Sequence, residues 1–81
     1  MEAAIIGKII KRFREERQFS QEVLSGLADV DRSHLSKIEL GLRSPTIHVL
    51  YKIANALGVN ASEILKAVEL ETIKCTINRQ V

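Results

Sequence analysis

The sequence predicts an all-α fold of five short helices, followed by a C-terminal tail of uncertain form. Apolar residues recur at helical spacing in successive segments, and a capping residue or a glycine separates most of these segments. Only three of the 81 residues are aromatic. The core must therefore be built from Ile, Leu, Val and Ala, which favours a small helical bundle. A chain of this length is expected to form one domain.

The first helix is expected over residues 3–17, where Ile6, Ile9, Ile10 and Phe13 repeat at helical spacing. Lysine, arginine and glutamate fall mostly on the opposite face, so this helix is amphipathic. The two residues that follow it break the pattern.

A second helix is expected at 21–28, because Ser20 before it is a suitable N-cap. Four of its apolar residues are expected to be buried: Val23, Leu24, Leu27 and Ala28. Ser25 and Gly26 lie between them and lower the helix propensity. Small residues at these positions indicate that another backbone comes close.

The third helix, at 32–40, follows after a break of only three residues, 29–31. Asp29 can adopt a left-handed backbone conformation at modest cost. Asp31 is a good N-cap, and its negative charge suits the N-terminus of a helix. Gly41 can end the helix.

The fourth helix is expected between Thr46, which can act as its N-cap, and Gly58, which ends it. Pro45 disfavours helical backbone at Ser44, so the preceding residues form a loop. Five residues make up the apolar face of this helix: Ile47, Leu50, Ile53, Ala54 and Leu57.

A fifth helix begins after Asn60, and Glu63 three residues on completes the pattern of a capping box. The tail beyond it is ambiguous. Four β-branched residues favour a strand: Thr72, Ile73, Thr76 and Ile77. A helical stripe fits as well: Leu65, Val68, Thr72 and Cys75.

The short link between the second and third helices forces them to cross steeply, as in a helix-turn-helix. In that motif the second helix enters the major groove of DNA with its N-terminal residues. Four residues are therefore expected to contact bases: Arg32, Ser33, His34 and Lys37. Four others are expected to contact phosphates: Gln21, Ser36, Arg43 and Ser44. The net charge of only +2 indicates a few placed contacts rather than general attraction to nucleic acid.

Residues 6–66 resemble the Cro and phage-repressor type of helix-turn-helix family, also called XRE-like. The resemblance is carried by GKIIKRFREERQFSQEVLS at 7–25, VDRSHLSKIELGLRSPTIHVLYKIANALGV at 30–59 and NASEIL at 60–65. It implies a compact, five-helix, lambda-repressor-like domain that regulates transcription. Such proteins bind a pseudo-palindromic DNA operator as homodimers and place the helix at 32–40 in the major groove. Small restriction–modification controllers and autoregulatory repressors are the similar proteins of about this length.

The resemblance also implies roles for individual residues. It pairs Arg14 with Glu39 as a structural ion pair between the first and third helices. We expect a helix-turn-helix domain at 1–67, and residues 68–81, which lie outside the resemblance, as an extension and candidate dimerisation element. Four residues are candidates for exposed dimer contacts: Leu42, Tyr51, Val59 and Leu70. The chain departs from the family at the turn, where Asp29 replaces the usual glycine, and at Leu40 and Leu42, where polar residues are more common.

The sequence contains few features of other functional classes. It offers no nucleophile with a positioned base and no glycine-rich phosphate cradle, so we expect no enzymatic activity. The single Cys75 makes no intrachain disulfide, and the two histidines are 14 residues apart, so we expect no metal and no cofactor. We also expect no small-molecule ligand, no membrane contact and a cytoplasmic location, because no segment resembles a membrane span or a secretory signal.

One alternative to a DNA-binding regulator is a protein-interaction adaptor or anti-repressor that keeps the fold without reading DNA. The polar residues of the third helix would then be an ordinary solvated face. The presence of Gln21, Arg32, Lys37 and Arg43 favours DNA binding over this alternative.

Overall fold

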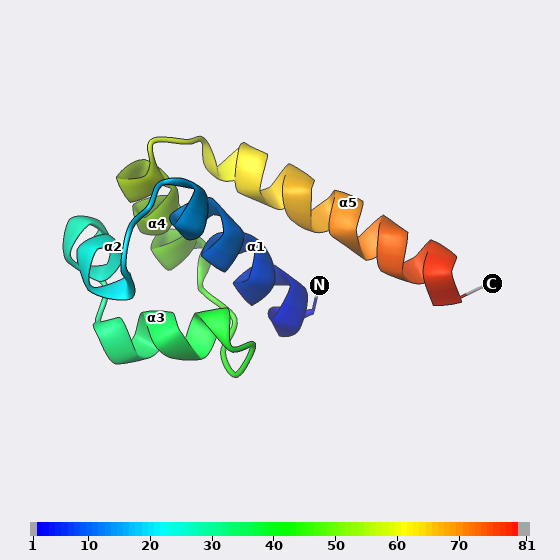
Figure 1. Cartoon of the computed structure of the whole chain (residues 1–81), viewed down its shortest axis with the longest axis horizontal. Coiled ribbons are helices and arrows are strands. Elements are labelled where there is room, and N and C mark those ends of the chain that lie inside the picture. Colours follow the sequence, from blue (N-terminus) through cyan, green and yellow to red (C-terminus); the bar gives the residue numbers. More distant parts are fainter. Residues whose placement is uncertain (1, 80–81) are drawn as a thin grey trace.

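The computed structural model describes residues 2–79 and folds them into five helices (Figure 1). The helices are α1 (Ala3–Glu16), α2 (Gln21–Ala28), α3 (Arg32–Glu39), α4 (Ile47–Leu57) and α5 (Ala61–Arg79). No strand occurs among the described residues, as the all-α prediction requires. Residues 80 and 81 of the predicted extension lie outside the described residues. α1 packs between α3 and α5, and the C-terminal part of α5 projects away from the other helices (Figure 1).

Local capping bonds define most of the helix ends. The Ser20 hydroxyl accepts from the Val23 N–H at 3.1 Å and begins α2. The Thr46 hydroxyl begins α4 in the same way, accepting from the N–H of Val49 at 3.2 Å. Gly58 ends α4 with a left-handed φ of 74°. These three predictions are confirmed.

Two predicted caps differ in detail. Asp31 precedes α3, but its side chain makes no bond to the helix N-terminus. Its carboxylate instead accepts from the Ser33 hydroxyl. At α5, the Glu63 carboxylate accepts from the Asn60 N–H at 2.7 Å, which is one half of the predicted capping box.

The core is aliphatic and is assembled from all five helices. Its largest fully buried side chains are Ile9, Ile10, Leu24, Leu35, Ile38, Ile53, Leu57, Ile64 and Val68. The prediction that Val23 and Leu27 are buried is wrong, since they are 46% and 61% exposed. Ile47, on the predicted apolar face of α4, is 74% exposed. α2 packs on α3 and α4 through a narrower face than predicted, and Ile47 is the first residue of α4. Val59, expected at the surface, is part-buried against the core.

Among the four glycines, Gly7 has the closest neighbouring backbone, where α1 crosses the end of α3. A Cβ atom at Gly7 would lie 2.1 Å from the Ile38 carbonyl oxygen. Gly26, where a close approach was predicted, has no such neighbour within 4 Å. The prediction is therefore wrong for Gly26, whereas Ser25 beside it is buried.

The ambiguous tail is helical, and α5 continues without a break through the boundary predicted at 67 and 68. Its threonines are accommodated because their hydroxyls bond back to the preceding turn. Thr72 donates to the Val68 carbonyl at 2.8 Å, and Thr76 donates to the Thr72 carbonyl at 3.0 Å. Lys8 of α1 forms an ion pair with Glu71 at 2.8 Å, which ties α1 to α5.

Candidate nucleic-acid interface

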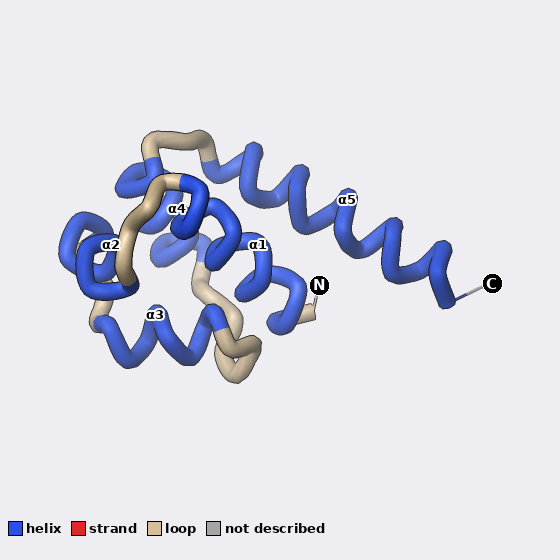
Figure 2. The backbone as a smooth tube through the Cα atoms, viewed as in Figure 1, coloured by secondary structure: helices blue, strands red, loops and turns tan. Residues whose placement is uncertain are grey.

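The turn between α2 and α3 consists of three residues and reverses the chain tightly (Figure 2). Asp29 has φ 54° and ψ 49°, which is the left-handed conformation predicted for it. The turn is closed by main-chain bonds from the Asp29 N–H to the Gly26 carbonyl at 3.3 Å and from the Val30 N–H to the Ser25 carbonyl at 3.0 Å. α3 therefore starts at a fixed angle to α2.

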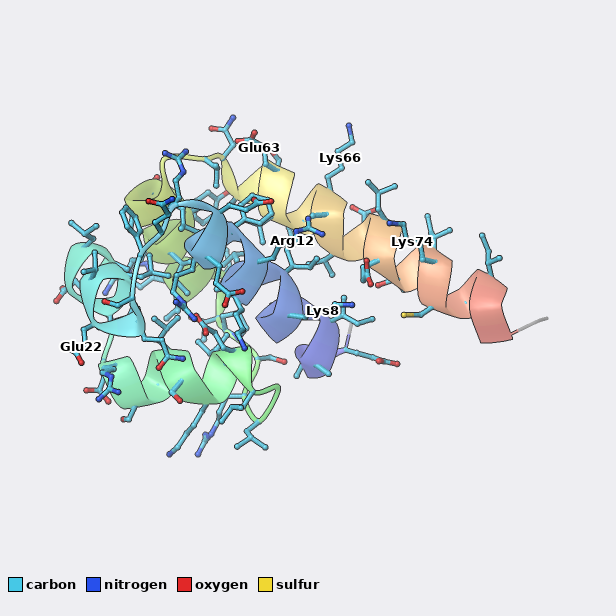
Figure 3. The ribbon with its side chains drawn as sticks, in the orientation of Figure 1. Lys8, Arg12, Glu22, Glu63, Lys66 and Lys74 are labelled. Carbon is cyan, nitrogen blue, oxygen red and sulfur yellow. The ribbon has the colours of Figure 1, made fainter. Side chains whose placement is uncertain are left out.

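The predicted base-contacting residues lie on the outer side of α3. Leu35 and Ile38 anchor the inner side in the core. Arg32, Ser33 and Lys37 are exposed. His34 and Ser36 are half-buried. Side chains along α3 project from the lower edge of the molecule, away from the other helices (Figure 3). The outer side of α3 can therefore enter a groove of DNA without any rearrangement of the core.

The predicted phosphate contacts flank this surface. Arg43 and Ser44 are exposed in the loop between α3 and α4. Leu40 and Leu42 are each 69% exposed at the end of α3 and in the same loop, so two apolar side chains accompany the polar ones. Gln21 lies at the first position of α2 and is half-buried.

Gln21 is joined to a buried charge pair. Its Nε2 donates to Glu39 Oε1 at 3.0 Å. The same carboxylate accepts from Arg14, whose Nε lies 2.7 Å from Oε2 and whose Nη2 lies 3.0 Å from Oε1. Arg14 Nη1 also donates to the Phe19 carbonyl at 2.8 Å. The network thus connects the end of α1, the start of α2 and the end of α3.

The Arg14–Glu39 pair is largely withdrawn from water, with side-chain exposures of 11% and 2%. The hydrogen bonds from the guanidinium to Glu39 raise the pKa of Arg14 above its usual value, so Arg14 stays charged. No buried side-chain nitrogen or oxygen among the described residues lacks a hydrogen-bond partner. The charge is therefore buried at little cost in lost hydrogen bonds.

Lys52 also contributes to this region, although no sequence pattern indicated it. Its Nζ donates to the Asp29 carbonyl at 3.3 Å, from α4 to the turn before α3. The two residues are 23 positions apart, so no local pattern connects them.

The described part of the chain supports neither a metal site nor a membrane-spanning helix. It contains no group of three or more His, Cys, Asp or Glu residues placed to hold a metal ion. None of the described helices is long and apolar enough to cross a membrane.

A family model described as helix-turn-helix matches residues 10–64, which include every predicted DNA contact. The chain is 34% identical over 61 residues to the uncharacterised HTH-type transcriptional regulator y4dJ of Sinorhizobium fredii, covering 75% of this chain and 79% of that protein. It is 36% identical over 66 residues to the control protein C.MunI of a Mycoplasma species, covering 80% and 89% respectively. In one longer transcriptional regulator, the region that matches this chain makes up only 13% of that protein.

Among solved structures, the chain resembles the restriction–modification controller protein C.Esp1396I. That structure contains a tetramer in complex with its natural 35 base-pair operator. The match has a TM-score of 0.82 and 27% sequence identity, and it covers 90% of this chain and 96% of that chain. The similarity thus includes α5, beyond the stretch that the family model matches.

Proposed function

This chain belongs to the helix-turn-helix family, and from that premise we propose that it regulates transcription by binding a pseudo-palindromic DNA operator as a homodimer. The observation that carries the proposal is the exposed outer side of α3, fixed by the tight turn after α2. The similarity to y4dJ, C.MunI and C.Esp1396I supports a regulator over an adaptor without DNA binding.

Base reading is assigned to the exposed side of α3. Arg32 and Lys37 carry donors that suit the O6 and N7 acceptors of guanine. Ser33 donates its hydroxyl proton to Asp31 and keeps its oxygen lone pairs as acceptors, which suit an amino group of adenine or cytosine. His34 is half-buried beside them and is assigned to base contact as well, whereas Ser36, also half-buried, is assigned to phosphate contact.

Phosphate binding is assigned to residues on either side of α3. Gln21 uses one N–H on Glu39, and its amide nitrogen carries a second N–H that can donate to a phosphate. The network with Arg14 and Glu39 would then hold this donor in place before DNA arrives. Arg43 and Ser44 supply further donors from the loop after α3.

Dimerisation is assigned to the apolar surface of α4 and α5. An apolar groove of about 430 Å³ lies between the two helices and is lined by Pro45, Ile47, Leu50, Tyr51, Ala61, Ser62 and Leu65. Further along α5, Leu70, Ile73 and Ile77 are each more than half exposed and follow one another at helical spacing. A two-fold dimer would place α3 of each copy in successive major grooves about 34 Å apart.

The control protein C.MunI and the controller C.Esp1396I suggest the biological setting. We propose that the chain acts as a restriction–modification controller or an autoregulatory repressor.

Selection of duplexes from a random DNA pool tests the proposal. We expect the chain to enrich an inverted repeat, and to bind it much more weakly at 200 mM than at 50 mM salt, because phosphate contacts release counterions. Enrichment of no sequence, or of a single unrepeated half-site, would contradict sequence-specific binding by a homodimer.

A further inference from the structure

The turn before α3 carries a conformational and an electrostatic cost at Asp29. Its left-handed backbone is one that a residue with a side chain adopts less readily than glycine. Its carboxylate also stands at the C-terminal end of α2, where the helix dipole already concentrates negative charge. The last turn of α2 contains no basic residue to offset this charge.

Lys52 places a positive charge at this helix end from a different element. Its Nζ donates to the main-chain carbonyl of Asp29 at 3.3 Å. α2 and α4 pack against each other, and Lys52 is half-buried at their junction. The ammonium group therefore compensates the C-terminus of α2 as a lysine in its own last turn would.

The peptide unit that follows Asp29 is held on both sides. Its carbonyl accepts from Lys52, and its N–H, which belongs to Val30, donates to the Ser25 carbonyl at 3.0 Å. Because a peptide unit is planar, two bonds on opposite sides fix its orientation. α3 begins only two residues later, at Arg32, so this orientation determines how the chain enters α3.

We infer that Lys52 is a positioning residue for DNA recognition, which fixes the Asp29–Val30 peptide and thereby the end of α3 that presents Arg32 and Ser33. The inference rests on the proposed DNA binding, but it does not require Lys52 to touch DNA. Lys52 acts through the main-chain carbonyl of the turn, whose left-handed residue is Asp29 and not glycine.

Lys52→Met is the first test, because it removes the ammonium group and keeps an unbranched apolar side chain. We expect it to weaken binding to the duplex selected by the unmodified chain by about two- to tenfold, the range of one hydrogen bond. Lys52→Arg keeps a charged donor and is expected to restore most of the affinity. Lys66→Met on α5 is the matched control, since Lys66 is exposed and points away from the domain (Figure 3).

Asp29→Gly separates positioning from direct DNA contact. With glycine in the left-handed position, the turn needs less support. Lys52→Met is therefore expected to reduce DNA affinity less in the Asp29→Gly variant than in the unmodified chain. An equal loss in both backgrounds, together with a salt slope reduced by about one, would assign Lys52 to phosphate contact and overturn the inference. A loss no greater than that of Lys66→Met would overturn it as well.

Amide hydrogen exchange at Val30 gives a readout that needs no DNA. Lys52→Met is expected to speed exchange of this amide, while amides in the middle of α1 and α4 keep their protection. Unchanged exchange at Val30 would overturn the inference. If the unmodified chain selects no duplex, the proposed function fails, and the exchange measurement still decides whether Lys52 holds the turn.

Discussion

Arg14 is the residue whose removal should damage the scaffold most. Its loss leaves the almost fully buried carboxylate of Glu39 with only the hydrogen bond from Gln21. We expect Arg14→Ala to lower the free energy of unfolding by about 3–5 kcal/mol, measured by urea denaturation. Lys11→Ala, at an exposed position of the same helix, is the control and is expected to change it by less than about 0.5 kcal/mol. Equally small effects of both substitutions would show that the pair adds little stability.

Lys37 should govern sequence preference rather than stability. It is exposed on α3, so Lys37→Ala is expected to leave the unfolding midpoint unchanged. We expect it to cost about 1–3 kcal/mol of binding and to relax the preference at one base position of each half-site. Competition among duplexes with single base changes measures this. A loss spread evenly over all duplexes would assign Lys37 to phosphate contact instead.

Residue-level predictions mostly succeeded where the responsible interactions are local, although the Asp31 side chain does not cap α3. The cap at Ser20 and the left-handed Asp29 depend on neighbours within a few positions, so the sequence contains the necessary information. The exposure of Val23 and Leu27 depends on how much of α2 the other helices cover, which helical spacing alone does not specify. The contact from Lys52 to the turn exists only once α2 and α4 are packed.

Gly7 and Gly26 form a matched pair at the level of helix packing. A methyl group at Gly7 would meet the backbone of α3, which is held by the core and cannot move aside cheaply. We expect Gly7→Ala to destabilise the fold by about 1–3 kcal/mol. A methyl group at Gly26, within α2, would meet no neighbouring atom. We therefore expect Gly26→Ala to raise the free energy of unfolding by about 0.5–1 kcal/mol, because alanine favours a helix more than glycine does. Thermal unfolding of the two variants compares them, and equal effects would contradict the packing of α1 on α3.

The Lys8–Glu71 pair makes the α1–α5 contact dependent on pH. The hydrogen bond and charge of Lys8 lower the pKa of Glu71, while Glu71 raises the pKa of Lys8. The stabilisation from Glu71 is therefore present above its usual pKa and is lost as the pH falls through the lowered value. We expect Glu71→Gln to lower the melting temperature slightly at pH 7 and to have no effect near pH 2. A difference that persists in acid would point to a role other than the ion pair.

At the level of helices, the ambiguity of α5 had a physical origin. Its β-branched residues carry little helix propensity, and a strand pattern fitted them equally well. What favours the helix is the burial of Val68 against the core, and the threonine hydroxyls find acceptors in the preceding turn. The helical stripe through Val68 is present in the sequence, but which of the two patterns prevails depends on packing against the other helices.

The projecting part of α5 makes the whole molecule asymmetric, with principal extents of 42 × 23 × 23 Å. Apolar side chains on this segment are expected to meet a second copy. We expect Ile73→Asp to shift the chain from dimer to monomer in analytical ultracentrifugation and to weaken binding to the full operator more than to one half-site. Lys74→Asp introduces the same side chain at a neighbouring exposed position and is the control. A monomeric unmodified chain, or a dimer unaffected by Ile73→Asp, would contradict this role for α5.

The architecture as a whole was more predictable than its surfaces. Five helical segments with short connections allow few arrangements, and the family resemblance selects one of them. The candidate DNA contacts followed from the position of α3 after a tight turn. Which apolar residues are exposed followed only in part, because exposure results from packing among all the helices. Leu42, Tyr51 and Leu70 are exposed as expected, whereas Val59 is part-buried.

The division of α3 between a buried and an exposed side has an evolutionary consequence. Leu35, Ile38 and Glu39 hold the helix in the fold, while Arg32 and Lys37 are exposed and anchor nothing in the core. After gene duplication, one copy could acquire a new target through two or three substitutions on the exposed side, without passing through an unfolded intermediate. Two such copies in one cell could then diverge into separate circuits while sharing an unchanged scaffold.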